Sequence, residues 1–323
     1  RASYAFQPRL SGRAWPWQGG DQVTLRQALD RALPDPRNQL TSRNRSGSVQ
    51  SVVELPQAPG LAWLQGSTRS SLFGRTLREV PDKQDSVHPS ELRWPGVLGR
   101  RAGARSGRLT ELAGPDGRRV WLYWPPGLVA GTALPLLVVL DGEIWVENQD
   151  WATTLDNLIV DGRVRPCWGV FVDSGGRERR WQELGADGAG LAWLADRLVP
   201  WVWEECPVSR SARDVVVAGQ SLGALTALRA VIERPDRFGG AISQSASLWQ
   251  VRPEELLAGC DVSTARFYIE VGTHEWVLKD PNARLAALLE GRAAEVRFAP
   301  YNGGHDYACW RCGLAQGVAA LLG

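Results

Sequence analysis

The sequence predicts an α/β fold in which a mostly parallel central sheet carries helices on both faces. Three observations predict it. Beyond about residue 110, short apolar segments alternate with longer stretches that show helical spacing. Several of those apolar segments are continuous, as in strands that are buried on both faces. Before residue 110 the alternation is missing and Arg, Ser, Pro and Gly are common, so we expect a second, smaller region there.

The first region, residues 1–109, is predicted to be a small, mostly β domain followed by a linker. Residues 48–59 read as a strand that proline ends, and residues 80–90 and 99–107 read as loops. Residues 110–323 would form the larger α/β domain, and a chain of 323 residues is long enough for both. The alternative for the first region is a disordered basic extension, and five aromatic residues argue against it: Tyr4, Phe6, Trp15, Trp17 and Trp63.

The larger domain is predicted to contain seven strands and three clear helices. The strands are 120–125, 134–142, 168–174, 214–219, 239–247, 266–272 and 295–300. The helices are 191–205, 222–234 and 307–322. Pro200 is expected to kink or divide the first helix, and Pro235 ends the second.

The composition excludes several classes of function. A formal net charge of +2 gives no electrostatic reason to expect nucleic acid as a partner. No apolar run approaches about 20 residues, so we predict no membrane span, and the odd number and irregular spacing of the cysteines favour a cytoplasmic protein. There are five cysteines, and Cys309 and Cys312 form a C-x-x-C pair. Neither a thioredoxin-like context nor enough histidine for a zinc site accompanies that pair, so we expect plain thiols, no metal site and no cofactor.

The candidate nucleophile is Ser221, in the pattern Gly-x-Ser-x-Gly between Gly219 and Gly223. The pattern alone is weak, but here it joins a predicted strand to a predicted helix, which is the context that a nucleophile elbow requires. The two glycines allow the tight turn and the close approach of helix to strand. The backbone N–H of Leu222 would then lie at a helix N-terminus, where it can stabilise an oxyanion.

A serine nucleophile needs a base, and the chain has only three histidines. His88 lies in the N-terminal region, His274 follows the strand 266–272, and His305 follows the strand 295–300. In the α/β-hydrolase fold the catalytic residues occur in the order serine, acid, histidine. That order predicts His305 as the base.

The acid is expected directly after the strand that precedes the histidine, which selects Glu275. Its rivals are Glu270, within that strand, Asp280, further along, and Asp306, beside the histidine. A Ser–His dyad without an acid stays open. A second oxyanion donor is expected after the strand 134–142, from the backbone N–H of Gly142 or Glu143.

With these residues placed, the sequence resembles the enterochelin (ferric enterobactin) esterase family of the α/β-hydrolase superfamily. The resemblance rests on five blocks: 140–145 (LDGEIW), 172–184 (VDSGGRERRWQEL), 216–228 (VVAGQSLGALTAL), 234–247 (RPDRFGGAISQSAS) and 301–317 (YNGGHDYACWRCGLAQG). It implies hydrolysis of the trilactone of catecholate siderophores in the cytoplasm, with iron entering only as part of the substrate. It also implies that the N-terminal region is the end of a β-sandwich domain.

A ferric tris-catecholate carries about three negative charges, so the resemblance implies that cations and aromatic rings contact the substrate. The candidate cations are Arg177, Arg179, Arg180 and Arg311. The candidate rings are those of Trp145, Trp276 and Trp310. Two other functions stay open: an esterase D-type carboxylesterase or acyltransferase that acts on small or carbohydrate esters, and a catalytically silent siderophore-binding protein. The sequence leaves the oligomeric state open as well.

Overall fold

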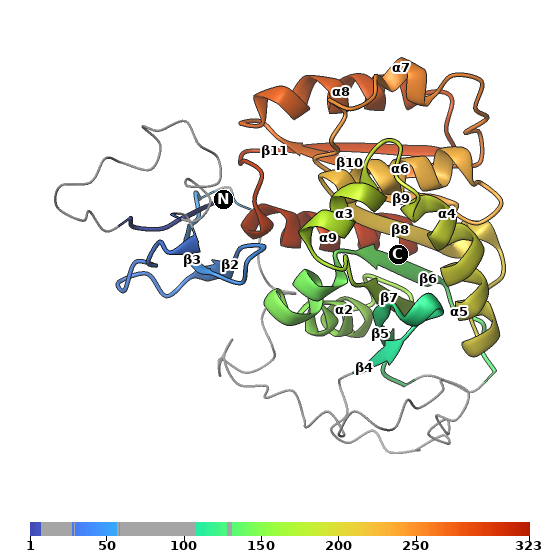
Figure 1. Ribbon diagram of the computed structural model, residues 1–323, viewed down its shortest axis with the longest axis horizontal. Helices are drawn as coiled ribbons and strands as arrows, with labels where there is room; N and C mark the ends of the chain where they lie inside the picture. The colour runs from blue at the N-terminus through green and yellow to red at the C-terminus, as the bar shows by residue number, and fades with distance from the viewer. Residues whose placement is uncertain (8–27, 29, 57, 59–106, 128–130) are drawn as a thin grey trace.

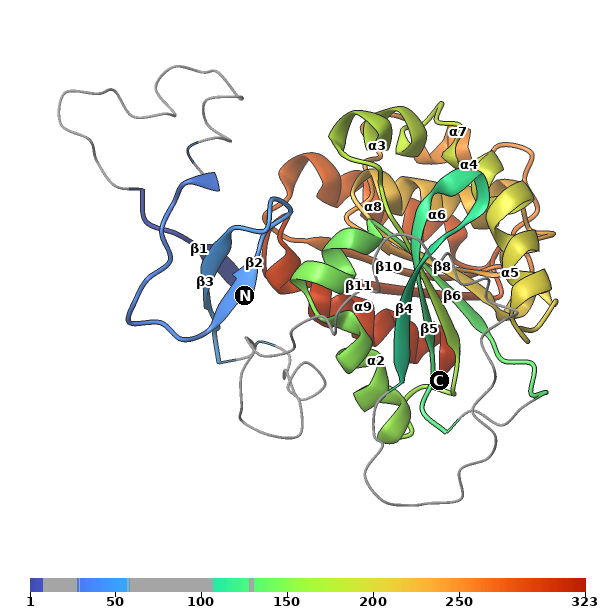
Figure 2. The same ribbon diagram turned by 60° about the horizontal axis from the view of Figure 1, so that its bottom comes forward.

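A computed structural model describes residues 1–7, 28, 30–56, 58, 107–127 and 131–323 of the chain. Its central feature is an eight-stranded sheet in the order β11-β10-β9-β8-β6-β7-β5-β4. The six strands from β11 to β7 run parallel, whereas β5 pairs antiparallel with β7 and β4 pairs antiparallel with β5. Helices cover both faces of this sheet (Figures 1 and 2). The predicted α/β fold with a mostly parallel sheet is therefore confirmed.

All seven predicted strands are present, with ends that differ by a few residues. They are β5 (Arg119–Trp124), β6 (Leu136–Leu140), β7 (Trp168–Val172), β8 (Val215–Gln220), β9 (Gly240–Gln244), β10 (Arg266–Gly272) and β11 (Glu295–Tyr301). The sequence reading missed β4 (Arg108–Ala113), the edge strand. Because β4 begins before residue 110 and pairs with β5, it joins the large sheet across the predicted boundary between the two regions. The boundary itself stays a prediction.

The predicted helices are also present, and others join them. Residues 191–205 are divided as expected, into α4 (Gly190–Trp193), a π-helical turn η6 (Leu194–Leu198) and α5 (Val199–Glu205), with Pro200 in the first turn of α5. The other two predicted helices are α6 (Leu222–Glu233) and α9 (Tyr307–Leu322). Further helices among the described residues are η4 (Pro115–Gly117), η5 (Ile144–Asn148), α2 (Trp151–Val160), α3 (Arg177–Leu184), η7 (Ala212–Asp214), α7 (Pro253–Leu256) and α8 (Trp276–Leu289).

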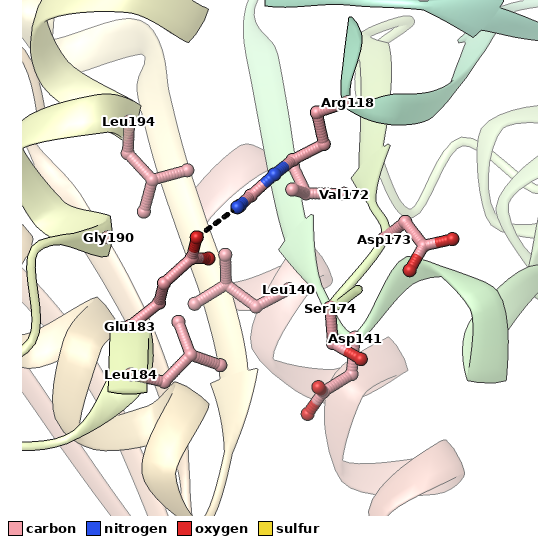
Figure 3. A pocket seen from close by; sticks show the side chains of 10 residues that line it. All are labelled: Arg118, Leu140, Asp141, Val172, Asp173, Ser174, Glu183, Leu184, Gly190 and Leu194. Carbon is pink, nitrogen blue, oxygen red and sulfur yellow. Dashed lines mark hydrogen bonds and ion pairs between the residues drawn. The ribbon is translucent and has the colours of Figure 1, made fainter. Parts of the chain in front are cut away.

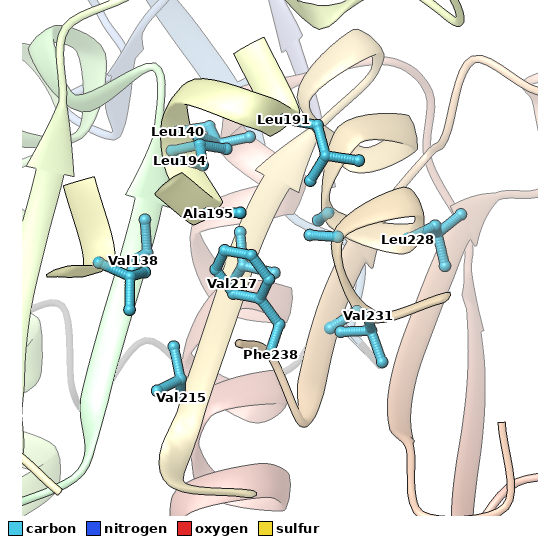
Figure 4. Packing of buried hydrophobic residues seen from close by; sticks show 14 of the residues in the cluster. Val138, Leu140, Leu191, Leu194, Ala195, Val215, Val217, Leu228, Val231 and Phe238 are labelled. Carbon is cyan, nitrogen blue, oxygen red and sulfur yellow. The ribbon is translucent and has the colours of Figure 1, made fainter. Parts of the chain in front are cut away.

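Two apolar clusters lie on opposite faces of the sheet. The first packs strand residues such as Val217 against α4, η6 and α6 (Figure 4). The second packs residues such as Val216 and Val139 against α2 and α9. Neighbouring residues of β8 thus enter different clusters, because successive side chains of a strand point to opposite faces. Burial on both faces explains the continuous apolar runs of the sequence.

The N-terminal residues form a small antiparallel sheet in the order β1-β3-β2, from β1 (Ala2–Tyr4), β2 (Thr41–Arg43) and β3 (Val49–Val53). The predicted strand 48–59 corresponds to β3, which ends before Pro56. This sheet lies beside the start of α9 (Figures 1 and 2). Tyr4 and Phe6 make an edge-on ring contact with centroids 6.0 Å apart. The predicted loops 80–90 and 99–106, with His88, Trp15, Trp17 and Trp63, lie outside the described residues.

Candidate active site

Ser221 lies at a strained turn between β8 and α6. Its backbone has φ 59° and ψ −114°, a region that a residue with a side chain rarely adopts. The turn is held because Ser221 N donates to Gln244 O at 3.0 Å and Ser247 N donates to Ser221 O at 3.1 Å. A Cβ atom at Gly219 would collide with the backbone of Gly223, so this position needs glycine. The geometry is that of a nucleophile elbow.

The elbow leaves polar groups next to the Ser221 hydroxyl. Ser221 Oγ lies 3.2 Å from Ser247 Oγ, at hydrogen-bond distance. Leu222 is the first residue of α6, and the first N–H groups of a helix have no acceptor within the helix. This is the position that the sequence predicts for the Leu222 N–H group, from which it could stabilise the negative charge that develops on a bound carbonyl oxygen.

His305 and Glu275 are brought together by two neighbouring parallel strands, β10 and β11. Gly272 at the end of β10 lies opposite Tyr301 at the end of β11, so the two following loops run side by side. His305 Nδ1 lies 2.6 Å from Glu275 Oε2. This contact leaves Nε2 as the ring nitrogen that can exchange a proton with a hydroxyl group.

The ring of His305 is fixed by Trp310, whose ring meets it edge-on with centroids 4.6 Å apart. The His305 side chain is 42% exposed, so the imidazole faces solvent at the carboxyl edge of the sheet. The described hydrogen bonds of Ser221 and His305 do not join these two side chains to each other. Catalytic hydrogen bonds of this kind are often long without substrate and shorten in the complex.

Glu275 is a buried carboxylate with a full set of donors. Its Oε1 accepts hydrogen bonds from Ser245 Oγ at 2.7 Å, from Gly272 N at 2.8 Å and from the Tyr301 hydroxyl at 2.8 Å. Burial alone would raise the pKa of Glu275, but the hydrogen bond and charge of His305 and the bonds from Ser245 and Gly272 lower it below its usual value. The carboxyl group therefore stays ionised beside the imidazole.

The three rival acids have other surroundings. Glu270 is fully buried in β10, accepts from Gln244 Nε2 at 2.6 Å, and has its pKa raised by burial to about 8. Asp280 is exposed within α8. Asp306 caps α9, accepting from Ala308 N at 2.9 Å, and also accepts from Ser3 N at 2.7 Å. Of the four carboxyl groups, Glu275 is the one that contacts His305.

The loop after β6 holds the candidate second oxyanion donors. Asp141 has φ 57°, and its carbonyl oxygen accepts from Ile144 N and Trp145 N at 3.0 and 3.4 Å. A Cβ atom on Gly142 would lie 2.5 Å from the Phe171 carbonyl carbon, so only glycine fits. We call residues 141–143 the oxyanion loop. It adjoins the elbow, since a Cβ atom on Gly223 would lie 3.7 Å from Asp141 Oδ2.

The carboxyl groups of the oxyanion loop are held by cations and a hydroxyl group. Arg180 donates to both oxygens of Asp141, at 2.6 and 2.8 Å, and Arg45 Nη1 lies 3.1 Å from Asp141 Oδ1. Burial would raise the pKa of Asp141, but these two guanidinium groups lower it. Glu143 accepts from Ser174 N at 3.0 Å and from the Ser174 hydroxyl group. A cavity of about 10 Å³ behind Asp141 and Ser174 has room for about one water molecule (Figure 3).

Two of the arginines predicted to contact substrate are used elsewhere. Arg180 is paired with Asp141 and donates from Nη2 to Gln220 O at 3.1 Å, so its guanidinium group is held within the protein, and its contact with substrate stays a prediction. Arg311 is buried, and only its Nη1 has a described hydrogen bond, to Thr41 O at 3.4 Å, so burial makes its predicted contact with substrate wrong. Arg177 is exposed in the first turn of α3, and Arg179 is exposed and pairs with Glu183 at 2.8 Å.

Two of the predicted tryptophans are core residues. Trp145 is fully buried, and its Nε1 donates to Gln220 Oε1 at 2.9 Å. Trp310 is buried and packs between His305 and Tyr307. A catechol ring cannot reach either indole, so both predictions are wrong. Trp276, by contrast, is 88% exposed directly after Glu275.

The sequence reading missed an exposed aromatic pair near the elbow. Trp181 and Trp249 are more than half exposed, and their ring centroids are 6.1 Å apart at an interplanar angle of 34°. Trp181 follows Arg180, which contacts Gln220 O, and Trp249 lies two residues after Ser247, which contacts Ser221. The signal in the sequence was weaker: Trp181 lies within the block 172–184, and Trp249 lies two residues after the block 234–247.

Three further predictions concern the cysteines, a metal site and a membrane span. All five cysteines are free thiols, as expected. Among the described residues no group of three or more His, Cys, Asp or Glu side chains is placed to hold a metal ion. No described helix is both long enough and apolar enough to cross a bilayer.

Several of the known proteins that this chain resembles are esterases. Residues 115–321 match the family described as "Putative esterase". The iron(III) enterobactin esterase of Escherichia coli K12 is 31% identical over 336 residues, which cover 99% of this chain and 76% of that protein. The iron(III) salmochelin esterase of E. coli O6:H1 is 26% identical, covering 90% and 67%. The enterobactin esterase of Shigella flexneri, solved in the presence of enterobactin, is 28% identical with a TM-score of 0.70, covering 93% and 73%.

Proposed function

The chain belongs to the enterobactin esterase family, and we propose that it is a serine esterase which hydrolyses the lactone esters of ferric catecholate siderophores such as enterobactin. Hydrolysis of siderophore esters agrees with the relatives that act on enterobactin and on salmochelin. Cleaving the trilactone weakens the hold of the ligand on iron, so release of the metal is the expected purpose of the reaction.

The observation that carries the mechanism is the 2.6 Å contact of His305 Nδ1 with the ionised Glu275, at the same edge of the sheet as the Ser221 elbow. Glu275 fixes the imidazole tautomer, so that the proton resides on Nδ1 and Nε2 is free to accept one. It also stabilises the positive charge that the ring acquires. Glu275 therefore supports a triad rather than a Ser–His dyad.

In the first half of the reaction Ser221 Oγ attacks the ester carbonyl carbon while His305 Nε2 accepts the hydroxyl proton. The negative charge that develops on the carbonyl oxygen is stabilised by the N–H of Leu222 and that of Gly142 or Glu143. The tetrahedral intermediate expels the alkoxide of the serine-derived lactone, which takes the proton from His305, and leaves an ester bond between Ser221 and the acyl group. In the second half water attacks that ester, again with His305 as base, and Ser221 is released.

Substrate contacts are proposed for the exposed side chains around this edge. Trp181, Trp249 and Trp276 offer aromatic faces on which catechol rings can stack. Arg177 and Arg179 offer guanidinium groups for the negative complex. Because Arg180 is paired with Asp141 and Arg311 is buried, they are not part of this proposal.

The remaining expectations follow from the same proposal. Iron enters only within the substrate, and no resident cofactor is required for ester hydrolysis by these residues. A cytoplasmic location stays a prediction, which fractionation of cells would test. The oligomeric state stays open.

Chromatography of the products from iron(III) enterobactin tests the proposal. Wild-type protein should convert the cyclic trilactone to its linear and shorter forms. Ser221→Ala should abolish these products, because the nucleophile is lost, while binding of the complex stays within about threefold. Unchanged product formation by Ser221→Ala would remove this serine from the mechanism. Failure of the wild-type protein to act on the siderophore, with activity on small esters, would favour an esterase D-type function.

A further inference from the structure

The turn between β2 and β3 of the small N-terminal sheet reaches the oxyanion loop of the large domain. Arg45, at the tip of this turn, contacts three residues there. Its Nη1 lies 3.1 Å from Asp141 Oδ1, and its Nη2 lies 3.2 Å from Glu143 Oε1 and 3.1 Å from Ser174 Oγ. One side chain from the N-terminal sheet thus connects both acidic residues of the loop with the end of β7.

The turn that presents Arg45 is itself rigid. Asn44 Oδ1 accepts from Ser46 N at 3.0 Å and from Ser48 N at 2.9 Å, and Arg43 Nη1 donates to Gly47 O at 2.6 Å. A separate bond docks the turn, because Gln149 Nε2 donates to Arg43 O at 2.8 Å. Local bonds of this kind fix the backbone before any contact is made, so Arg45 is preorganised for the loop.

The charges explain what Arg45 does for the loop. Asp141 and Glu143 are two residues apart, and Asp141 lies between Arg45 on one side and Arg180 on the other. Burial and the nearby charge of Asp141 raise the pKa of Glu143, as expected for two carboxyl groups of like charge on one short loop. Without Arg45, Asp141 would keep only Arg180 as a cationic partner and the partly buried Glu143 would lose its ion pair, on a loop whose first residue already has φ 57°.

We propose that Arg45 is a positioning residue, supplied by the N-terminal sheet, which holds the Gly142 and Glu143 N–H groups in place for the transition state. The inference rests on the proposed function, because it assigns these N–H groups to the oxyanion site. If Arg45 has this role, the N-terminal sheet contributes a residue that is needed for full catalytic activity. Arg45 acts through the loop backbone and does not touch the reacting atoms.

A direct role in binding the anionic complex is the competing explanation, because the Arg45 side chain is 35% exposed. The two roles differ in a measurable way. An oxyanion donor acts mainly in the transition state, so misplacing it lowers kcat on any ester. A cation that binds the siderophore would instead raise KM, and only for the charged substrate.

The test compares Arg45→Ala with the wild-type protein on iron(III) enterobactin and on p-nitrophenyl butyrate, a small neutral ester. We expect kcat to fall about 10- to 100-fold on both esters, which is the cost of a small misplacement of catalytic groups, with KM changed less than about threefold. Arg45→Lys should recover part of the loss, because one ammonium group can meet Asp141 but cannot also reach Glu143 and Ser174.

Arg37→Ala is the matched control. It removes an exposed arginine of the same N-terminal region that is not part of the turn presenting Arg45, and its kcat should stay within about twofold of the wild type. Thermal unfolding of each variant separates loss of activity from loss of fold, and Arg45→Lys keeps the test informative if Arg45→Ala unfolds. A loss confined to KM or to the siderophore, or no loss at all, would overturn the proposal. If neither ester is cleaved by the wild-type protein, the proposed function itself fails.

Discussion

The buried carboxylates of Glu275 and Asp141 follow two parallel strands on either side of the elbow, and they are paired with different types of residue. Glu275 follows β10 and contacts a histidine and three neutral donors, whereas Asp141 follows β6 and is paired with two arginines. Both have a pKa lowered by these partners. A histidine can take up and return a proton near neutral pH, but an arginine cannot. The Glu275 end is therefore suited to moving protons, and the Asp141 end to holding geometry.

The largest effect should come from neutralising the two carboxylates separately. Glu275→Gln should lower kcat about 10³- to 10⁴-fold with little change in the unfolding temperature, because the imidazole loses the partner that fixes its tautomer. Asp141→Asn should lower kcat only about 10- to 100-fold but destabilise the fold by about 3–5 kcal/mol, because it breaks a buried ion pair. Steady-state kinetics and thermal unfolding of both variants measure the contrast.

Glu270→Gln provides the matched control for the Glu275 end. It lies on β10, the strand that Glu275 follows, and burial raises the pKa of its carboxyl group to about 8, so this group is mostly protonated at neutral pH. Its kcat should stay within a few-fold of the wild type. Full activity in Glu275→Gln would break the comparison and leave a Ser–His dyad. A loss of kcat in Asp141→Asn equal to that in Glu275→Gln would also break it, because the two ends would then not differ in role.

A smaller effect is expected at Trp181 and Trp249, which contact neither carboxylate. If these rings stack on catechol groups, Trp181→Ala and Trp249→Ala should each raise KM for iron(III) enterobactin about 3- to 10-fold, in line with the usual strength of aromatic pairs. Neither should change KM for p-nitrophenyl butyrate. Phe6→Ala, which removes an exposed aromatic ring from the N-terminal region, is the control. Equal changes on both esters would assign the pair to packing.

The sequence predicted the residues around Glu275, which move protons, better than the residues around Asp141, which hold the geometry of the site. Ser221, Glu275 and His305 each follow a strand whose apolar run is visible locally, so strand order alone brought them to one edge. Arg45 contacts Asp141 across 96 positions of the chain (141 minus 45), and no local pattern announces such a contact. The same limit explains Arg180 and Arg311, because an arginine beside the active-site blocks looks the same whether it is free or paired.

The sequence also did not predict which aromatic side chains are buried and which are exposed. Trp145 and Trp310 lie within the blocks that flank the site, yet their indoles point into the apolar cluster shared by α2 and α9. Trp181 and Trp249 face solvent instead. Adjacency to a functional loop gives the position of a side chain along the chain, but not the face on which it lies. The edge strand β4 escaped prediction because its segment, residues 108–113, crosses the boundary predicted between residues 109 and 110.

The most direct test of the central claim, that Ser221 is the nucleophile, is the mass of the intact protein after treatment with a fluorophosphonate. The reagent reacts with a serine whose hydroxyl group is activated by a neighbouring base. We expect one adduct per wild-type chain, located on Ser221 by peptide mapping, and none on Ser221→Ala. An unlabelled wild-type chain, or an adduct that persists in Ser221→Ala, would contradict the assignment.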